Sequence, residues 1–510
     1  MFTSPPTKPA HPRTRLLTLI AVAALGTGPA AVRAGTDIIV NWDGSGDYIT
    51  IQAALDAATN GDTIIVMPVS PVPTVPRYAE NLAFPPKAIT LRSSDPTDPA
   101  IVASTIITGN YAGRVIDFDP ATPVSATVAG FTIMNGQATY AAAINFGSAS
   151  PTIEHCRIID NHASNAGNSV FGGAVVGNGS NAVLRDCQIL ANAIDTSLDG
   201  YGAVFFWEGA PTITRCTIAG SNRTHTRNIA YAGGLYLYNT TAEVSACRIL
   251  ANTSQGSGYS QGGGLSVSGP ATPHIRSCII AHNDAFGSFS YGGGIRCVSG
   301  TTAVLAHCTI SHNTAHYGCQ LWCTGSGTNV ALHDSIVWST PGLLPPMRIE
   351  DSAKLNVAHS NVFDGAEFQW VMTGGVLNWQ AGNLDANPLF IAPYGTGVYP
   401  WDDYDFHLAA GSPCISAGDP EFAAGPGETD IDGEPRVLGC ATDMGADESA
   451  FGYAGDLDNN GATTVADYAL FTPCVTGPDL PSAPDCPCAD LDTDGDVDLV
   501  DFARLQSLIG

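Results

Sequence analysis

Basic residues are scarce in this chain. Its 510 residues include 20 Lys and Arg against 47 Asp and Glu, which gives a formal net charge of −27. Proteins that bind nucleic acid need a basic face that contacts the phosphates. The composition therefore argues against nucleic acid as a partner.

Long apolar runs are missing after residue 34, because no later run approaches the ~20 residues that a membrane-spanning helix needs. The one earlier run, Leu16–Leu25, follows three basic residues and precedes a small-residue cleavage site, Val32-Arg33-Ala34. This order is typical of a secretory signal peptide. We predict a signal peptide at 1–34, bacterial-type export, and a mature chain without a transmembrane segment that is secreted or held at the cell surface. An uncleaved anchor or a disordered leader is the alternative.

Amphipathic helical stripes are absent from the middle of the chain, where a different period dominates. The motif Cys-x-Ile-x-x-Asn recurs there with Cys-to-Cys steps of 31, 29, 31, 31 and 30 residues. A fixed period of this size indicates stacked repeat units rather than several globular domains. One copy is degenerate, and the copies begin at Cys156, Cys187, Cys216, Cys247, Cys278 and Cys308.

Each unit also contains a glycine pair that opens a short apolar strand, as at Gly172-Gly173 and Gly233-Gly234. A turn and the Cys-x-Ile strand follow. Short β-branched strands that repeat without helices predict a mainly β protein, namely a single-stranded parallel β-helix with ~30-residue coils. We place these coils at 111–380 and expect a monomer.

The recurring cysteine and isoleucine are two residues apart, so they point to the same face of a strand. Equivalent side chains on coils ~4.8 Å apart form columns, and a compact hydrophobic residue such as cysteine suits an inner column. The alternative is a metal or redox row, although no CxxC pair or histidine accompanies it. Cys297 and Cys323 are register-equivalent if Ile295 aligns with Leu321, which makes them a candidate disulfide.

The recurring asparagine is also interpreted as structural. Asparagine tolerates the left-handed conformation of a sharp turn, and its amide can pair with the asparagine of the next coil. His282 and His312 precede two of these asparagines on successive coils. A stacked histidine pair is one interpretation, and a pair of histidines on the surface of the turns is the other.

The segment 35–110 is expected to hold an N-terminal cap and the first coils. Ile51, Leu55 and Ala58 lie at helical spacing, Gly61-Asp62 ends that helix, and Thr63–Val66 forms a strand. A helix here would cover the open end of the coils. The motifs Asp43-Gly-Ser-Gly-Asp-Tyr48, Ile51-Gln-Ala-Ala-Leu-Asp-Ala-Ala58, Gly61-Asp-Thr-Ile64 and Tyr78-Ala-Glu-Asn81 resemble the opening of pectin-lyase-like right-handed β-helix proteins.

That resemblance implies a right-handed solenoid that binds or processes extracellular polysaccharide, as a lyase or glycoside hydrolase if it is an enzyme. The family's catalytic motifs have no counterpart here. The Gln-Asp pair and the Gly-x-x-Asp-Phe-x-Phe-Gly strand of the methylesterases are missing. Lyases of the family use Arg or Lys as the base, and the chain after residue 34 has only two lysines, Lys87 and Lys354. We therefore assign no catalytic residue. A non-catalytic adhesion protein with the solenoid as binding wall is the alternative, and Trp207, Tyr236, Tyr238 and Trp322 are candidate sugar platforms or core aromatics.

The segment 381–451 is expected to close the other end of the solenoid. Its acidic motifs, Asp430-Ile-Asp-Gly-Glu-Pro-Arg436 and Asp443-Met-Gly-Ala-Asp-Glu448, resemble the C-terminal closure of secreted bacterial β-helix repeat proteins. We interpret these acids as turn and capping residues. Cys414 and Cys440 are a possible disulfide.

Two twelve-residue loops in the last segment, 452–510, have the spacing of EF-hand calcium loops. Oxygen ligands stand at positions 1, 3, 5 and 12, a glycine at position 6, and a backbone carbonyl is expected at position 7. Because the segment holds eleven Asp, no Glu and one Arg, a cation would offset the repulsion between its carboxylates. The predicted ligands of two Ca²⁺ ions are Asp456, Asp458, Asn460, Ala462 and Asp467, and Asp490, Asp492, Asp494, Asp496 and Asp501.

The duplicated loop-helix pattern resembles a type I dockerin, which predicts a small α-helical calcium-loop domain. The resemblance implies a cohesin-like or cell-surface protein as partner. Family dockerins contact cohesins through positions 10 and 11, often Ser-Thr, whereas this chain has Val465-Ala466 and Leu499-Val500. Cys474 is a candidate to pair with Cys486 or Cys488 between the loops.

Overall fold

The computed structural model describes residues 35–69, 78–220, 223–339, 345–394, 403–438, 441–449 and, within 455–509, all but 459, 461, 479, 481–485, 487 and 493. The predicted signal peptide at 1–34 lies outside the described residues. No helix within the described ranges is long and apolar enough to span a membrane.

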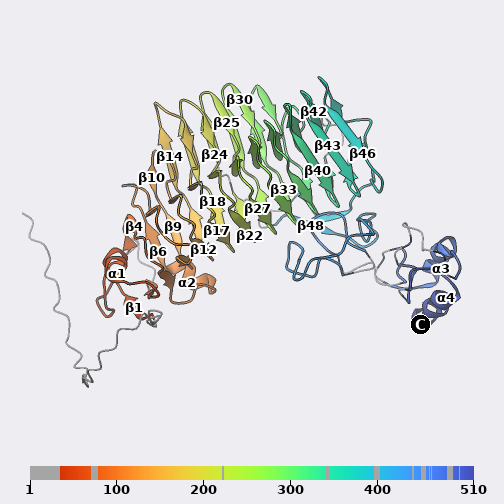
Figure 1. Ribbon diagram of the computed structural model, residues 1–510, viewed down its shortest axis with the longest axis horizontal. Helices are drawn as coiled ribbons and strands as arrows, with labels where there is room; N and C mark the ends of the chain where they lie inside the picture. The colour runs from red at the N-terminus through yellow and green to blue at the C-terminus, as the bar shows by residue number, and fades with distance from the viewer. Residues whose placement is uncertain are drawn as a thin grey trace, which may run out of the picture. The chain divides into compact units, whose positions relative to one another are not determined.

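Three long parallel sheets form the coils (Figure 1). Sheet 1 contains β1 (Asp37–Val40), β2 (Thr63–Val66), β5 (Thr90–Ser93), β8 (Thr127–Ala129), β12 (Thr152–Glu154), β17 (Val183–Arg185), β22 (Thr212–Thr214), β27 (Glu243–Ser245), β32 (His274–Arg276), β37 (Val304–Ala306), β40 (Asn329–His333), β43 (Lys354–Ala358) and β46 (Val376–Trp379). Sheet 2 contains β3 (Tyr78–Ala79), β6 (Ile106–Thr108), β9 (Thr132–Met134), β13 (Arg157–Ile159), β18 (Gln188–Leu190), β23 (Thr217–Ala219), β28 (Arg248–Leu250), β33 (Ile279–Ala281), β38 (Thr309–Ser311), β41 (Ile336–Trp338) and β44 (Asn361–Val362). Sheet 3 contains β4 (Leu82–Phe84), β7 (Ile116–Phe118), β11 (Ile144–Gly147), β16 (Val175–Asn178), β21 (Val204–Trp207), β26 (Leu235–Tyr238), β31 (Leu265–Ser268), β36 (Ile295–Val298), β39 (Leu321–Thr324), β42 (Met347–Glu350) and β45 (Trp370–Val371).

Two further parallel sheets project from the middle coils as a fin, because the chain runs from sheet 2 into sheet 4, then sheet 5, and returns to sheet 3. Their inward side chains, including Ala163, Val170 and Ile194, pack against one another. Sheet 4 contains β10 (Gln137–Ala138), β14 (His162–Asn165), β19 (Ala193–Thr196), β24 (Arg223–Thr226), β29 (Thr253–Gly256) and β34 (Asp284–Phe286). Sheet 5 contains β15 (Val170–Phe171), β20 (Gly200–Tyr201), β25 (Ile229–Tyr231), β30 (Tyr259–Gln261) and β35 (Phe289–Tyr291).

The strand register confirms the predicted parallel solenoid. In sheet 2, Ile158 pairs with Ile189, which pairs with Ile218, and the same column continues through the isoleucines of the next coils. These isoleucines are fully buried in one core cluster that sheets 1, 2 and 3 share. Burial of such columns along every coil supplies the main hydrophobic contribution to stability.

The cysteine ladder lies in the same core, as expected for an inner column of compact side chains. All six thiols are at most 1% exposed and none forms a disulfide. Several donate to carbonyl oxygens, for example Cys247 Sγ to Ile213 O at 3.4 Å. Burial raises the pKa of Cys308 to about 12. The Cys308 thiol is therefore protonated and unreactive at neutral pH.

The motif asparagines form a hydrogen-bonded ladder at the neck of the fin, where sheet 2 leads into sheet 4. The Nδ2 atom of Asn252 donates to Oδ1 of Asn283 at 2.9 Å, and Asn283 repeats this contact with Asn313 at 3.0 Å. The expected amide pairing is confirmed. The left-handed backbone belongs instead to the preceding residue, with φ of 53° at Ala251 and 56° at His282.

The glycine pairs lie directly opposite this ladder, where sheet 5 returns to sheet 3. A Cβ atom at Gly264 would lie 2.7 Å from Nδ2 of Asn283, and one at Gly294 would lie 2.7 Å from Nδ2 of Asn313. A side chain at these positions would overlap the asparagine amides. The glycine pair and the asparagine of each coil are therefore two halves of one neck.

The N-terminal cap forms as the helical spacing predicts. Helix α1 (Ile51–Ala57) buries Ile51, Ala54 and Leu55 against the first coils, and β2 follows it. The two carboxylate oxygens of Glu80 accept hydrogen bonds of 2.9 Å from the backbone N–H groups of Ile51 and Gln52. Glu80 thereby satisfies donors that a helix N-terminus leaves open. A second short helix, α2 (Pro99–Ser104), starts at the cap residue Asp98.

The closing segment, defined as 381–451, packs along the outer face of sheet 2. Its apolar side chains Phe406, Ile431 and Ala446 form a cluster with the outward residues of β23, β28 and β33. Its two strands, β47 (Phe390–Ala392) and β48 (Asp405–Leu408), are antiparallel. The sequence pattern predicts an end piece, whereas these contacts lie on the side of the coils.

The C-terminal segment contains helices α3 (Val465–Phe471) and α4 (Leu499–Leu508), with a 3-10 turn, η2 (Thr472–Cys474), between them. Both α-helices begin with a capping box, built by Thr464 with Asp467 and by Asp498 with Asp501. A disulfide joins Cys474 to Cys486 with Cα atoms 5.7 Å apart, so Cys486 rather than Cys488 pairs with Cys474.

Replacing Gly264 with alanine tests the neck. Gly264→Ala places Cβ 2.7 Å from Nδ2 of Asn283 and 2.9 Å from the carbonyl oxygen of Gly294. We expect the free energy of unfolding in urea to fall by about 1–3 kcal/mol, the usual cost of overpacking. Gly167→Ala is the control, because no atom lies within 4 Å of a Cβ there, and it should be neutral. Equal effects of the two substitutions would contradict the paired neck.

Candidate functional site

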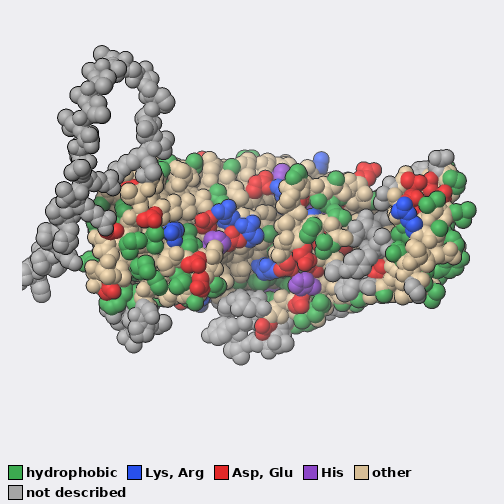
Figure 2. All heavy atoms as spheres, turned by 90° about the horizontal axis from the view of Figure 1, so that it is seen from below, with side chains coloured by type: hydrophobic (Ala, Val, Ile, Leu, Met, Phe, Trp, Pro, Cys, Tyr) green, Lys and Arg blue, Asp and Glu red, His purple; other side chains and the backbone are tan. Residues whose placement is uncertain are grey.

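A cavity of about 480 Å³ lies between the outer face of sheet 2 and strand β48. Thr217, Arg248 and Ile279 line it from sheet 2, and the segment Asp403–His407 lines it from the closing segment. Figure 2 shows acidic, basic and histidine side chains close together on one face of the molecule. The cavity is therefore lined by apolar, polar and charged side chains together.

Two acidic turns of the closing segment carry the carboxylates at the rim. Asp430 is fully buried, and its Oδ1 atom accepts from the backbone N–H groups of Asp432, Gly433 and Glu434 at 2.8–3.0 Å. Its Oδ2 atom accepts from the N–H of Glu448 at 3.0 Å, which ties the first turn to the second. Asp430 thus has the turn-forming role that the sequence predicts.

Arg436 anchors both turns from inside. It is 0% exposed, donates to the carbonyl oxygens of Ala446 and Gly445 at 3.1 Å, and pairs with Oε1 of Glu448 at 2.6 Å. A buried ion pair of this kind holds its position only while both partners are present. The turns are therefore rigid supports for the side chains at their tips.

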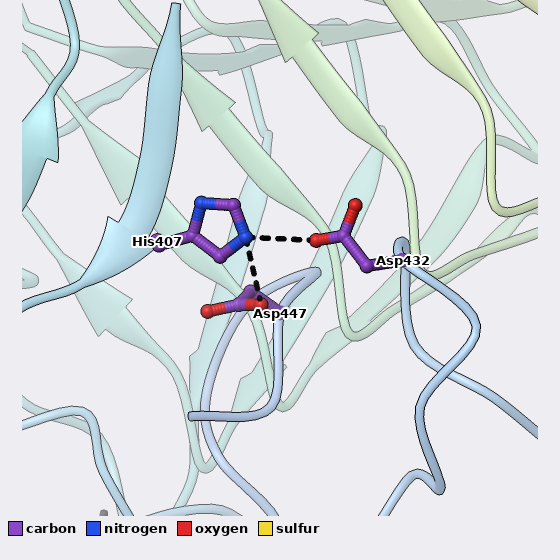
Figure 3. A group of neighbouring side chains, drawn as sticks. All are labelled: His407, Asp432 and Asp447. Atoms are coloured by element: carbon purple, nitrogen blue, oxygen red, sulfur yellow. Dashed lines mark hydrogen bonds and ion pairs between the residues drawn. The ribbon is translucent and has the colours of Figure 1, made fainter. Parts of the chain in front are cut away.

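His407 lies at the centre of those side chains (Figure 3). Its Nε2 atom is 2.9 Å from Oδ2 of Asp432 and 3.7 Å from Oδ1 of Asp447. Its Nδ1 atom pairs with Oδ1 of Asp405 on the same strand. The other oxygen of Asp432 accepts from Arg248 at 2.6 Å. The imidazole thus contacts Asp405, Asp432 and Asp447, and Arg248 is connected to it through Asp432.

The two carboxylates beside Nε2 of His407, those of Asp432 and Asp447, have different pKa values. The hydrogen bond to Asp432 raises the pKa of His407 to about 10, and the same bond lowers the pKa of Asp432 to about 2. Burial raises the pKa of Asp447 to about 7. Divergent pKa values of neighbouring groups in a cavity are typical of functional sites.

The acidic motifs of the sequence contain Asp432 and Asp447, but their spacing does not bring them together with Asp405 and His407 of β48. Arg248 belongs to a repeat 184 residues away from Asp432 along the chain. Nothing in the repeat pattern distinguishes this outward position of β28 from the others. The packing of the closing segment onto sheet 2 creates the cluster.

A second surface runs along the corner where sheet 5 meets the outer face of sheet 3. Rings on successive coils stack, with centroid distances of 4.7 Å for Phe171 and Tyr201 and 5.0 Å for Tyr201 and Tyr231. We call this row, with its neighbours on sheet 3, the aromatic band. It consists of Phe171, Tyr201, Phe205, Tyr231, Tyr236, Arg296, Tyr291, Tyr317, Trp322, Arg348 and Trp370.

Two of the four predicted sugar platforms are buried and two are accessible to solvent. Tyr236 is 4% exposed and Trp322 is 7% exposed, because the rings of sheet 5 cover them. Trp207 is 41% exposed and meets the half-buried Tyr238 edge to face, with centroids 5.7 Å apart. Trp207 and Tyr238 are the two that solvent reaches best, at the border of the aromatic band.

Arg296 is the buried cation of the aromatic band. It is 8% exposed, lies 5.2 Å from the ring centre of Tyr231 and 5.8 Å from that of Trp322, and donates to Oγ of Ser266 at 2.9 Å. No carboxylate pairs with it among the described residues, and its Nε atom has no hydrogen-bond partner there. By contrast, Arg348 pairs with Glu350 at 2.6 Å.

The two C-terminal loops gather the predicted metal ligands. Ligand oxygens of Asp456, Asp458 and Asp467 lie within 4.8 Å of one another, as do those of Asp490, Asp492 and Asp501. The loops share one internal pattern, because Oδ1 of Asp467 accepts from Leu457 N at 2.7 Å and Oδ1 of Asp501 accepts from Leu491 N at 2.6 Å.

These residues fit a calcium ion. Oδ1 of Asp490 is buried without a hydrogen bond in the described structure, and burial and the adjacent carboxylates raise the pKa of Asp492. All donors are oxygens, which Ca²⁺ prefers. Of the other predicted ligands, the Oδ1 atom of Asn460 accepts from Ala462 N at 3.0 Å and that of Asp494 from Asp496 N at 3.2 Å. These two contacts hold positions 5 and 7 of each loop together.

The other predicted disulfides have different outcomes. Cys297 and Cys323 are register partners in sheet 3, which confirms the alignment of Ile295 with Leu321, but both remain free thiols. Cys414 is a buried free thiol that accepts from Nδ2 of Asn361 at 3.0 Å. Its proposed partner, Cys440, lies outside the described residues.

Comparison with known proteins supports the fold. The family described as the right-handed beta helix region matches residues 142–337. A crystal structure of pectate lyase Pel9A is similar, with a TM-score of 0.44 and 12% sequence identity over 82% of this chain and 97% of that chain. A search of curated proteins finds no match. Together with the parallel register, the match over residues 142–337 supports a right-handed parallel β-helix for these coils.

Replacing Arg436 tests the support of the site. Arg436→Met leaves Glu448, which is 2% exposed, without its cation. We expect the free energy of unfolding to fall by about 3–5 kcal/mol, because a buried charge loses its partner. Arg215→Met is the matched control, since it breaks the 2.7 Å pair with Asp186 at a side chain that is 51% exposed, which costs at most about 1 kcal/mol. Urea titrations of both variants check this order.

Proposed function

We propose that this chain is an exported β-helix protein that binds an acidic polysaccharide along the aromatic band. The single observation that carries the proposal is Arg296, a cation that is 8% exposed and has no carboxylate partner among the described residues. A buried charge without a counter-ion is unfavourable, so this position favours an anionic ligand.

The surroundings of Arg296 suit a sugar carboxylate. The guanidinium lies 5.2 Å from the ring centre of Tyr231 and 5.8 Å from that of Trp322, and it donates a hydrogen bond of 2.9 Å to Oγ of Ser266. Guanidinium groups bind carboxylates through paired hydrogen bonds, and aromatic rings pack against the apolar faces of sugars. The buried Nε atom of Arg296 is the donor that a uronate carboxylate would use.

The repeat of the aromatic band suits a polymer rather than a small molecule. Its rings come from several coils of sheets 3 and 5, between Phe171 and Trp370, and Gln261 and Ser266 take their places on one coil. Trp207, Tyr259 and Phe289 extend the band with side chains that are 41%, 43% and 50% exposed. Clusters of exposed aromatic residues mark binding surfaces more often than ordinary surface. A chain of linked sugars can contact many coils at once.

The C-terminal segment is proposed as a calcium-dependent attachment module of the dockerin type. Positions 10 and 11 of both loops are exposed at the starts of α3 and α4, and three of them are apolar and large: Val465 at 78%, Leu499 at 80% and Val500 at 50%. Paired apolar residues on duplicated helix starts offer a docking surface for a protein partner. Calcium would hold the loops that position them.

The polysaccharide proposal predicts a loss of affinity on removing the cation. Arg296→Gln should weaken binding to polygalacturonate about 10–100-fold, the value of a hydrogen bond to a charged group. Isothermal titration at low salt measures it. Arg223→Gln is the matched control, because this arginine is on sheet 4 and is 51% exposed.

Two further observations decide the proposal. Dextran, a neutral polymer, should bind more weakly than polygalacturonate, and equal binding of both polymers by wild type and Arg296→Gln would refute the assignment. Absorbance of unsaturated products in the ultraviolet, measured on the same mixtures, separates a lyase from a binding wall.

The calcium proposal predicts two ions per full-length chain. Asp458→Ala and Asp492→Ala should each abolish one of the two binding events, because each removes the ligand at position 3 of one loop. Asp117→Ala, with a side chain that is 53% exposed on sheet 3, should bind two ions as the wild type does. Calorimetry that detects no calcium binding to the wild-type chain would rule out the module.

A further inference from the structure

One carboxylate in the His407 cluster, that of Asp447, lacks hydrogen-bond donors among the described residues. Asp447 is 6% exposed, accepts no hydrogen bond among the described residues, and its Oδ2 atom is buried without a partner. Its Oδ1 atom lies 3.7 Å from Nε2 of His407, which is too far for a hydrogen bond. A buried carboxylate without hydrogen bonds is costly, so Asp447 points to a ligand that the described side chains do not supply.

The orientation of His407 points to the same ligand. Because an ionised carboxylate can only accept, Nδ1 must donate its proton to Asp405. The Nε2 atom then faces Asp432 and Asp447 together, as Figure 3 shows. In the absence of a metal, Nε2 carries a proton and donates it to Asp432 at 2.9 Å, and a metal cation would take the place of that proton between the two carboxylates. A carboxylate that fixes the far nitrogen of a histidine is the usual support of a metal ligand.

The distances match a metal centre. The ligand atoms of His407, Asp432 and Asp447 all lie within 4.8 Å of one another, with His407 Nε2 2.9 Å from Asp432 Oδ2. Ligands about 2.0–2.2 Å from a tetrahedral zinc ion are separated by roughly 3.4 Å. The Nε2–Asp432 Oδ2 distance of 2.9 Å is below that spacing and the Nε2–Asp447 Oδ1 distance of 3.7 Å is above it, so the side chains would shift to hold the ion. His407 also lines the cavity, which offers a route of entry.

We propose that His407, Asp432 and Asp447 bind a divalent transition-metal ion, with Zn²⁺ as the representative. The nitrogen ligand distinguishes this centre from the C-terminal loops, whose donors are all oxygens and favour Ca²⁺. Asp405 orients the histidine, and Arg248 holds the second oxygen of Asp432 at 2.6 Å.

The ion joins segments that are far apart in the chain. His407 comes from β48, Asp432 and Asp447 come from the two acidic turns, and Arg248 connects Asp432 to β28 of sheet 2. The metal therefore cross-links the closing segment and strengthens its contact with the coils. This role is independent of the polysaccharide site, which lies on sheets 3 and 5.

The test uses the full-length chain with its calcium loops saturated by millimolar Ca²⁺. Zn²⁺ titration should then show one further ion per chain and a higher midpoint of thermal unfolding. Co²⁺ at the same site should give visible absorption bands that Zn²⁺ abolishes by displacement. These wild-type measurements do not depend on the folding of any variant.

Substitutions of the proposed ligands show whether the added Zn²⁺ binds at His407, Asp432 and Asp447. His407→Gln and Asp447→Asn should each weaken Zn²⁺ binding at least tenfold, and Asp405→Asn should weaken it about 10–100-fold through the orientation of the histidine. His225→Gln is the matched control, since His225 pairs with Asp195 at 3.1 Å on exposed sheet 4. Its Zn²⁺ affinity should equal that of the wild type.

Two results would overturn the proposal. One is a wild-type chain that takes up no Zn²⁺ or Co²⁺ beyond its calcium loops. The other is metal uptake that His407→Gln and Asp447→Asn leave unchanged while both variants keep the wild-type unfolding midpoint in metal-free buffer. Loss of polygalacturonate binding has no bearing on either outcome.

Discussion

The neck of the fin is the constraint on which the architecture depends. Motif asparagines of neighbouring coils there join through their amides, as Asn161 does with Asn192 at 3.0 Å and Asn252 does with Asn283 at 2.9 Å. The carbonyl of the sheet 2 strand in the preceding coil accepts from the same amide, with Asn283 Nδ2 2.8 Å from Ile249 O. Buried amides are stable only when satisfied, so the ladder sets the register between coils. The glycine pairs opposite leave the space for it.

This neck also determines where the binding surface forms. Because the coils of the fin leave sheet 2 and return to sheet 3 at equivalent positions, the rings of sheet 5 pack against those of sheet 3. Tyr201 thus reaches Phe205 and Tyr236, with ring centres 6.0 Å and 5.3 Å away. A row of aromatic side chains around Arg296 is the consequence, and it supports the proposed recognition of an acidic polymer.

The closing segment uses the opposite side of the coils. Its turns are held in place because Asp430 and Arg436 are fully buried and hydrogen-bond to backbone groups of both turns. That rigidity holds Asp432 and Asp447 beside His407 despite the repulsion between carboxylates. The local electrostatics differ from those of the C-terminal loops, where oxygens alone surround each site. The two proposed cation sites therefore differ in ligand chemistry, with a nitrogen ligand at the first and oxygen ligands alone at the second.

The sequence alone determined the period, the inner columns and the cap helix, because these depend on local spacing. The same is true of the spacing of the acidic residues in the two C-terminal loops and of the choice of Cys474 as a linker cysteine. Only the tertiary structure decided that Tyr236 and Trp322 are covered, that Arg296 lacks a counter-ion, and that Arg248 meets Asp432. The physical reason is that outward side chains of a repeat follow no pattern of their own. Their surroundings depend on which distant segment packs over them.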